Sequence, residues 1–152
     1  MKANGVFWRV VMISLPFGFA AMAEGPASSL QVSAAWAPAA AKTDANVPVF
    51  MTITNPGQAD SLVRARCPAA LFVEKDTTDY GEGAPATREI KAIPVPAGGT
   101  LTLEPGHDHL TLLHTQQPLQ QGDTVSCAVY FKNAGERRID VKIAAADAKH
   151  AP

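Results

Sequence analysis

The sequence has little excess charge, few aromatic residues and almost no cysteine. Its 152 residues carry a formal net charge of -1, and only 7% of them are aromatic. The balanced charge excludes a strongly basic nucleic-acid binder and an acidic disordered chain. The hydrophobic fraction of 47% is that of a folded protein, and the length is that of one domain.

Motifs of catalysis are also missing. The chain has no G-x-S-x-G nucleophile elbow, no phosphate-binding P-loop and no dinucleotide-binding glycine pattern. Its carboxylates are scattered, and nothing in the sequence assembles a nucleophile, a base and an orienting group. We therefore expect a protein that is not an enzyme.

Long hydrophobic runs are absent except at the start of the chain. The first part of residues 1–23 contains two basic residues, Lys2 and Arg9. An apolar stretch follows, and the segment ends on Ala21-Met22-Ala23. This is the layout of a secretory signal peptide, and the stretch is shorter than the roughly 20 residues that a membrane-spanning helix needs. We predict cleavage after Ala23 and a periplasmic or secreted location. The alternative is an uncleaved membrane anchor.

Cys67 and Cys127 are the only cysteines, and they belong to a chain that is predicted to be exported. An even pair in an oxidising compartment favours a disulfide. Closing a loop of about 60 residues would stabilise the fold by about 4 kcal/mol on the chain-entropy estimate. The alternative is a pair of thiolate metal ligands, which requires both cysteines to stay reduced.

The rest of the chain is typical of short strands separated by turns. Turn signals such as Asn55-Pro56-Gly57 and Glu104-Pro105-Gly106 recur at close intervals. The alternating or β-branched runs between them are residues 30–36, 47–54, 61–66, 71–74, 100–103, 109–113, 124–131 and 137–143. We predict an all-β domain over residues 24–143, an antiparallel β-sandwich, followed by a flexible tail over residues 144–152.

Alternation along two of these runs predicts which side chains face the core. Val49, Met51 and Ile53 share one face, so Met51 is expected to be buried and not available as a ligand. In the run 124–131, Cys127 shares a face with the large apolar side chains. The predicted disulfide therefore lies inside or beside the core.

Three of the four histidines are concentrated in residues 107–114. If a strand extends to His107, then His107, His109 and Thr111 project on one side, and two imidazoles two residues apart can reach one metal ion. His114 has the opposite parity and would need a bulge or a turn to join them. The simpler interpretation is a polar strand edge with solvated histidines.

Several short motifs occur in an order that is distinctive when they are taken together. They are Ala35-Trp36-Ala37, the run 50–57, Ala59-Asp60-Ser61-Leu62-Val63, the run 93–99, Leu103-Glu104-Pro105-Gly106, His109-Leu110 and the run 118–123. Over about residues 32–141 this order resembles the periplasmic copper chaperone family called PCu(A)C. The resemblance implies a cupredoxin-like β-sandwich. It also implies copper supply to a periplasmic acceptor such as a respiratory oxidase subunit.

The same resemblance places the family's copper ligands in this sequence. The family holds Cu(I) with a histidine, a methionine and a His-x-Met pair, whose spacing falls here on Asp76, Thr87, His109 and Thr111. Only His109 is retained. Thioether sulfur suits Cu(I), whereas carboxylate and hydroxyl oxygens are hard donors. The resemblance therefore implies a degenerate copper site.

Two functions remain open. In the first, a remodelled site of Asp76, His107 and His109, with His114 as a further candidate, binds Cu(II) or Zn(II) rather than Cu(I). In the second, no metal is bound and the domain is a protein-binding module in the periplasm. A simpler interpretation of Asp76 and His109 by themselves is a surface ion pair. Neither function involves a nucleic-acid partner, and both involve the membrane only through export.

Overall fold

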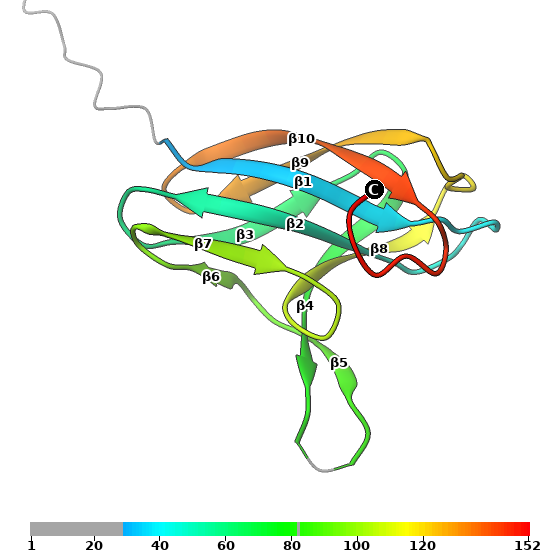
Figure 1. Ribbon diagram of the computed structural model, residues 1–152, viewed down its shortest axis with the longest axis horizontal. Helices are drawn as coiled ribbons and strands as arrows, with labels where there is room; N and C mark the ends of the chain where they lie inside the picture. Colours follow the sequence, from blue (N-terminus) through cyan, green and yellow to red (C-terminus); the bar gives the residue numbers. More distant parts are fainter. Residues whose placement is uncertain (1–28, 82) are drawn as a thin grey trace, which may run out of the picture.

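Ten strands and no helix make up the part of the chain that the computed structural model describes, residues 29–81 and 83–152 (Figure 1). The strands are β1 (Gln31–Pro38), β2 (Val47–Asn55), β3 (Asp60–Arg66), β4 (Ala70–Asp79), β5 (Ala86–Glu89), β6 (Ile93–Val95), β7 (Gly99–Leu103), β8 (His109–Thr115), β9 (Thr124–Phe131) and β10 (Gly135–Ala144). The described residues accordingly offer no helix that could cross a bilayer. The predicted signal peptide, residues 1–23, lies outside them.

The strands pair in the order β5-β4-β8-β2-β1-β10-β9-β3-β6, and β7 pairs with β2. β2 belongs to both sheets of the sandwich. Its first residues, Val47–Val49, pair with β8 in one sheet, and Met51–Asn55 pair with β7 in the other. Every pairing is antiparallel except that of β1 with β10. The predicted all-β sandwich is thus confirmed, with one parallel pair that local sequence patterns do not indicate.

The core follows the predicted alternation. Met51 is buried between Val49 and Ile53, and on β8 the side chains of Leu110 and Leu112 are buried as well. Met51 is therefore a core residue, as predicted. A second, smaller apolar cluster of Trp36, Phe50 and Ala144 forms separately from this core, and Ala148 in the predicted tail packs against it.

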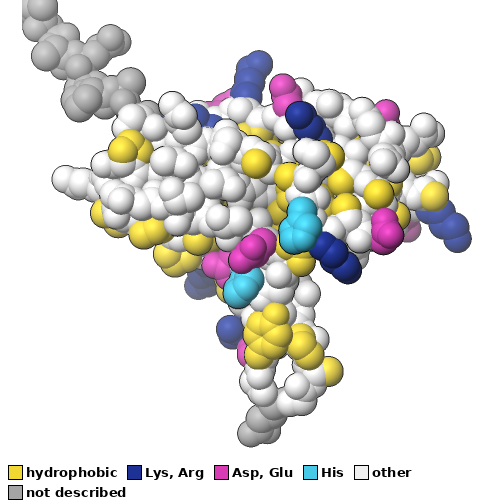
Figure 2. Space-filling model, viewed as in Figure 1, with side chains coloured by type: hydrophobic (Ala, Val, Ile, Leu, Met, Phe, Trp, Pro, Cys, Tyr) yellow, Lys and Arg dark blue, Asp and Glu magenta, His cyan; other side chains and the backbone are white. Residues whose placement is uncertain are grey.

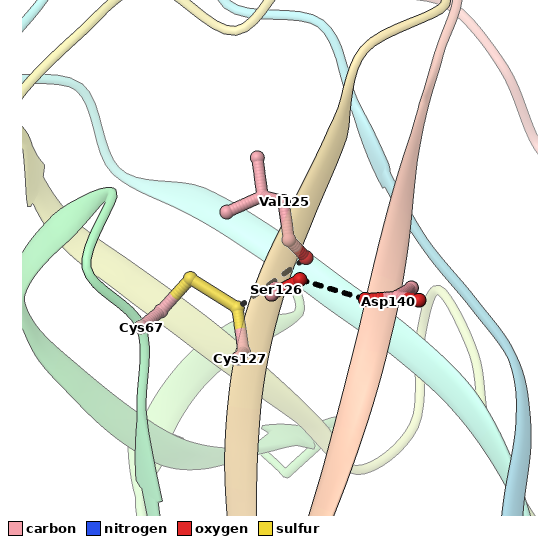
Figure 3. Close-up of a disulfide and its surroundings, with 5 residues drawn as sticks. All are labelled: Cys67, Val125, Ser126, Cys127 and Asp140. Atoms are coloured by element: carbon pink, nitrogen blue, oxygen red, sulfur yellow. Dashed lines mark hydrogen bonds between the residues drawn. A yellow bond between two sulfur atoms is a disulfide. The ribbon is translucent and has the colours of Figure 1, made fainter.

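The predicted disulfide is confirmed. Cys67, which follows β3, is bonded to Cys127 on the neighbouring strand β9, and both are buried (Figure 3). Beside it, the preceding residue on β9, Ser126, donates a hydrogen bond to Asp140 on β10. Neither cysteine is therefore available as a thiolate metal ligand.

An arm formed by β5 and the end of β4 projects from the sandwich (Figure 1). β4 pairs with β8 only as far as the pair Asp76 and His109, and from Thr77 to Asp79 it pairs with β5 alone. We call β5 together with β4 beyond Asp76 the arm. The sequence patterns missed β5 because all four of its side chains are exposed, so that no apolar alternation marks it.

Asp60 fastens the start of β3 to the turn between β9 and β10. Its carboxylate accepts hydrogen bonds from the backbone N–H groups of Ser61, Asn133 and Ala134 at 2.8, 2.9 and 2.8 Å. Burial alone would raise the pKa of Asp60, but these three bonds and the charge of Lys132 outweigh it and lower the pKa below its ordinary value of 3.8. The ionised form therefore stabilises the fold.

Replacing Asp60 with asparagine is expected to lower the free energy of unfolding by about 2 kcal/mol at neutral pH, because the three backbone N–H groups lose a charged acceptor and at most part of their bonding is kept by the neutral amide oxygen. A lowered pKa stabilises the fold above the unfolded pKa, and that contribution disappears as the pH falls through the folded value. Denaturant unfolding at neutral pH and below about pH 4 should therefore show the difference from wild type shrinking in acid. Asp140→Asn is the control, and a pH-independent difference would contradict this assignment.

Candidate metal site

The four positions at which the sequence resemblance predicts the copper ligands line one hollow. Asp76 on β4 lies directly opposite His109 on β8, and residues directly opposite each other project from the same face of a sheet. Thr111 lies two residues further along β8, and Thr87 is supplied by β5. The hollow measures 410 Å³ and is lined by Asn46, Pro48, Glu74, Asp76, Thr87, Glu89, His109, Thr111 and Leu113. Figure 2 shows the arm projecting from the sandwich, with exposed histidine and acidic side chains on the face in view.

His109 is held in an orientation that suits a metal ligand. The residue is only 7% exposed. The centre of its ring lies 6.0 Å from that of Phe50, and the Phe50 ring in turn contacts Trp36. Its Nδ1 lies 2.8 Å from the backbone oxygen of His107. A carbonyl oxygen can only accept, so Nδ1 carries the hydrogen and, in the neutral ring, Nε2 keeps its lone pair. Metal-binding histidines are commonly oriented by such a bond.

Asp76 is the other buried polar group of the hollow, with 3% of the residue exposed. Its carboxylate accepts a hydrogen bond from the hydroxyl of Thr111. Within the described residues no ion pair joins Asp76 to His109. The surface ion pair considered from the sequence is therefore wrong, because both residues are buried and Asp76 takes a hydroxyl partner instead.

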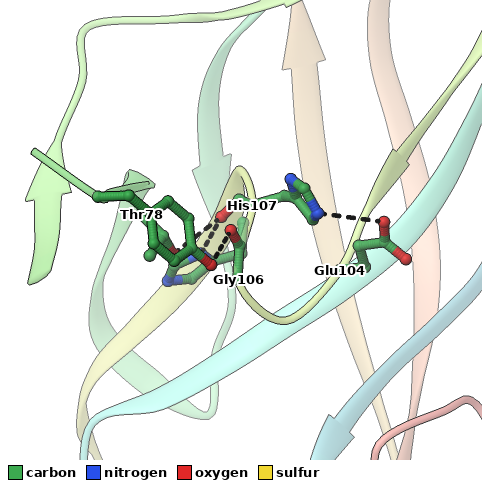
Figure 4. Close-up of polar contacts among 6 residues, drawn as sticks. Thr78, Glu104, Gly106 and His107 are labelled. Carbon is green, nitrogen blue, oxygen red and sulfur yellow. Dashed lines mark hydrogen bonds and ion pairs between the residues drawn. The ribbon is translucent and has the colours of Figure 1, made fainter. Parts of the chain in front are cut away.

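The structure does not bring His107 or His114 to this hollow. β8 begins at His109, so His107 lies in the preceding turn, where its Nε2 is 3.6 Å from Glu104 (Figure 4). His114 has a backbone φ of 54°, and its Nδ1 lies 2.5 Å from Asp44. The predicted grouping of these two histidines with Asp76 and His109 is corrected accordingly: their side chains pair with carboxylates elsewhere.

Two carboxylates of the hollow were not identified from the sequence. Glu89 on β5 lies directly opposite Asp76, and Glu74 on β4 lies opposite Thr111. Burial raises the pKa of Glu74, and the charges of Glu89 and Asp76 raise it further. The sequence does contain a pattern that indicates them. Glu74 is two residues from Asp76 and Glu89 is two residues from Thr87, so within a strand each pair projects from the same face.

The donors of the hollow are hard. They are one imidazole nitrogen and the oxygens of carboxylates, threonine hydroxyls and the Asn46 amide, with no sulfur, and Cu(I) prefers sulfur. As the side chains are placed, no three His, Cys, Asp or Glu residues of the described chain are grouped to hold a metal ion. A cation would therefore need His109, Asp76 and at least one further oxygen donor drawn in from the rim.

Known proteins resemble this chain in both sequence and fold. The LpqE-like family model, "Putative lipoprotein LpqE-like", matches residues 30–143. A protein of Leifsonia xyli subsp. xyli (strain CTCB07), "Putative lipoprotein Lxx21020", is 30% identical over 119 residues, which covers 77% of this chain and 70% of that protein.

Two solved structures have a similar fold. The apo PCuAC domain from PmoF1 has a TM-score of 0.65 and 26% identity, covering 76% of this chain and 93% of that one. The solution structure of CuI-DR1885 from Deinococcus radiodurans has a TM-score of 0.57 and 26% identity, covering 82% of this chain and 83% of that one. The resemblance and the cupredoxin-like β-sandwich expected from the sequence are both confirmed.

Proposed function

Because the chain belongs to the LpqE-like family and shares the fold of copper-bound PCuAC domains, we propose that it is an exported metal-handling protein whose cargo is Cu(II) or Zn(II) rather than Cu(I). One observation carries this proposal. The four positions at which the resembling family binds copper meet in one hollow, and three of them carry oxygen donors while His109 retains a free ring nitrogen.

The proposed ligands have distinct roles. Nε2 of His109 supplies the nitrogen, and Asp76 supplies a buried carboxylate that Thr111 orients through its hydroxyl. Glu89 is the best placed further donor, because it lies opposite Asp76 on an exposed strand and its long side chain is free to turn inward. Water or an acceptor protein would complete the four ligands that Zn(II) prefers.

The proposal also covers the export of the protein and the delivery of its metal. The relative from Leifsonia carries a lipoprotein name, which supports a location outside the cytoplasm. In that compartment the cargo would pass to a metal-accepting protein, and a subunit of a respiratory oxidase is the acceptor that the PCu(A)C resemblance suggests. Location in the periplasm rests on the leader features of residues 1–23.

A second function is favoured by the hydrogen bond that the Asp76 carboxylate already accepts. Its bond to Thr111 leaves the buried carboxylate with a partner in the absence of any metal. In addition, Leu71 and Phe72 on β4 are 59% and 63% exposed, so their apolar side chains are accessible to a partner protein. The alternative is therefore a metal-free protein-binding module in the periplasm.

Titration of the protein with Cu(II) and Zn(II) tests the first function. We expect binding with a micromolar or tighter Kd, and we expect His109→Ala to weaken it by about 100-fold, since the only nitrogen donor of the hollow is removed. His107→Ala and His114→Ala are the matched controls and should bind as wild type does, because their side chains pair with Glu104 and Asp44.

Isothermal calorimetry and chelator competition are the measurements. Failure of the wild-type protein to bind either ion would leave the metal-free module as the function. Equal losses in the His107 and His109 variants would place the metal site outside the hollow.

A further inference from the structure

The arm is held to the body by very few contacts. Among the described residues, β4 beyond Asp76 pairs with no strand other than β5. The arm nevertheless carries Thr87 and Glu89, two of the residues that line the hollow. The angle at which the arm leaves the sandwich therefore sets where these two side chains lie relative to His109.

Two hydrogen bonds cross to the turn that precedes β8, one from Thr78 on β4 in the arm and one from Tyr80, the residue that follows β4. The hydroxyl of Tyr80 donates to the backbone oxygen of Gly106 at 2.7 Å, and the hydroxyl of Thr78 donates to that of His107 at 3.4 Å (Figure 4). Gly106 has a φ of 85°, and a Cβ added there would come within 2.7 Å of the Tyr80 hydroxyl. Only glycine fits this turn together with the approach of Tyr80.

The backbone oxygen of His107 connects the arm to the metal-binding ring. It accepts the bond from Thr78 and also the bond from Nδ1 of His109, which lies 2.8 Å away. A shift of the arm at Thr78 therefore acts on the same carbonyl that fixes the orientation of the imidazole. The arm and the ring share one anchoring atom.

We propose that Tyr80, assisted by Thr78, is a positioning residue that clamps the arm to the Gly106–His107 turn and thereby sets the oxygen donors of β5 relative to His109. The effect on cation binding rests on the proposed function, whereas the clamp itself does not. Tyr80 lies four residues beyond Asp76, roughly 13 Å along an extended strand, so a bond there restrains the angle of the arm better than a contact at its base. Because Tyr80 is 60% exposed, packing contributes little to its role.

Tyr80→Phe tests the clamp, since it removes one hydroxyl and keeps the ring. Tyr130→Phe is the matched control, because Tyr130 is the only other tyrosine and its ring contacts Arg64 on the body. In the metal-free protein, backbone ¹⁵N relaxation should show increased motion of residues 77–81 and 83–89 in the Tyr80 variant alone. The ¹⁵N shifts of the neutral His109 ring should also move toward a mixture of tautomers. The thermal midpoint should stay close to that of wild type.

With Zn(II), the Tyr80 variant should bind about five- to tenfold more weakly than wild type, whereas the Tyr130 variant should not differ. Unchanged arm relaxation and an unchanged His109 ring in Tyr80→Phe would overturn the clamp, whatever the metal affinity. If wild type binds no divalent ion, the proposed function fails, but the relaxation and ring measurements still decide whether the clamp exists. A loose arm with unaltered Zn(II) affinity would overturn the positioning role.

Discussion

Replacing Asp76 with histidine and both Thr87 and Thr111 with methionine is expected to turn the hollow into a tight Cu(I) site. The three positions already line one hollow with His109, whose ring is already oriented, so the substitutions supply two thioethers and a second imidazole without new backbone geometry. Soft sulfur and imidazole donors suit Cu(I). We expect the Cu(I) affinity to rise by roughly 1,000-fold, which corresponds to about 4 kcal/mol.

The triple substitution is also compatible with the local hydrogen bonding. Thr111 donates to the Asp76 carboxylate, and both partners are replaced together, so no buried carboxylate is left without its donor. Competition with a Cu(I) chelator under anaerobic conditions measures the gain, and X-ray absorption should show sulfur in the copper shell. Adding His109→Ala to the triple variant is the control and should remove most of the gain. An unchanged affinity would show that the four positions do not converge on one ion.

Loss of the disulfide is expected to be the largest single destabilisation of the fold. Cys67 and Cys127 close a loop with a sequence separation of 60, and the chain-entropy estimate for such a loop is about 4 kcal/mol. Both residues lie in the buried core, so alanine at these positions also removes packed sulfur atoms. The double variant Cys67→Ala, Cys127→Ala should therefore unfold with a free energy lower by about 4 kcal/mol or more.

Denaturant unfolding with and without a reductant measures this contribution. Reductant should destabilise the wild-type protein by a similar amount and leave the double variant unaffected. Thiol titration of the denatured, unreduced protein should find no free thiol. Two free thiols, or a wild-type stability that reductant does not change, would contradict the disulfide and return the cysteines to the list of candidate ligands.

The fold was largely predictable because burial imposes a strict period of two on the strands of a sandwich. Met51 and Cys127 were assigned to the core on parity alone, and both are buried there. β5 and β6 left no such signal. All of β5 is exposed, and β6 contains only three residues, one of them Pro94, so that neither shows an alternating pattern of useful length.

The site was predictable only where its positions follow from spacing. The order of family motifs led to Asp76, Thr87, His109 and Thr111, which the fold does bring together. His107 was misplaced because parity holds only within a strand, and the turn at Gly106 ends just before His109. Glu89 was missed because its strand was missed.

Clamping contacts were even less accessible to sequence reasoning. The bonds of Thr78 and Tyr80 to the turn before β8 join residues 29 and 26 positions apart in the chain, and no local pattern encodes such pairs. They follow from the direction of the arm, which becomes visible only when β4 and β5 are placed in space. The same is true of the carbonyl of His107 that both Thr78 and His109 share.

The preference of the wild-type protein between monovalent and divalent ions tests the central claim most directly. The Cu(I) affinity of the wild-type protein is measured by competition with a chelator. Its Cu(II) and Zn(II) affinities are measured by titration of the same preparation, and the comparison of these affinities gives the preference. Hard donors around His109 predict micromolar or tighter binding of a divalent ion and only weak binding of Cu(I). Tight Cu(I) binding that is lost in His109→Ala would contradict the account, because it would show that the hollow holds a soft ion without sulfur.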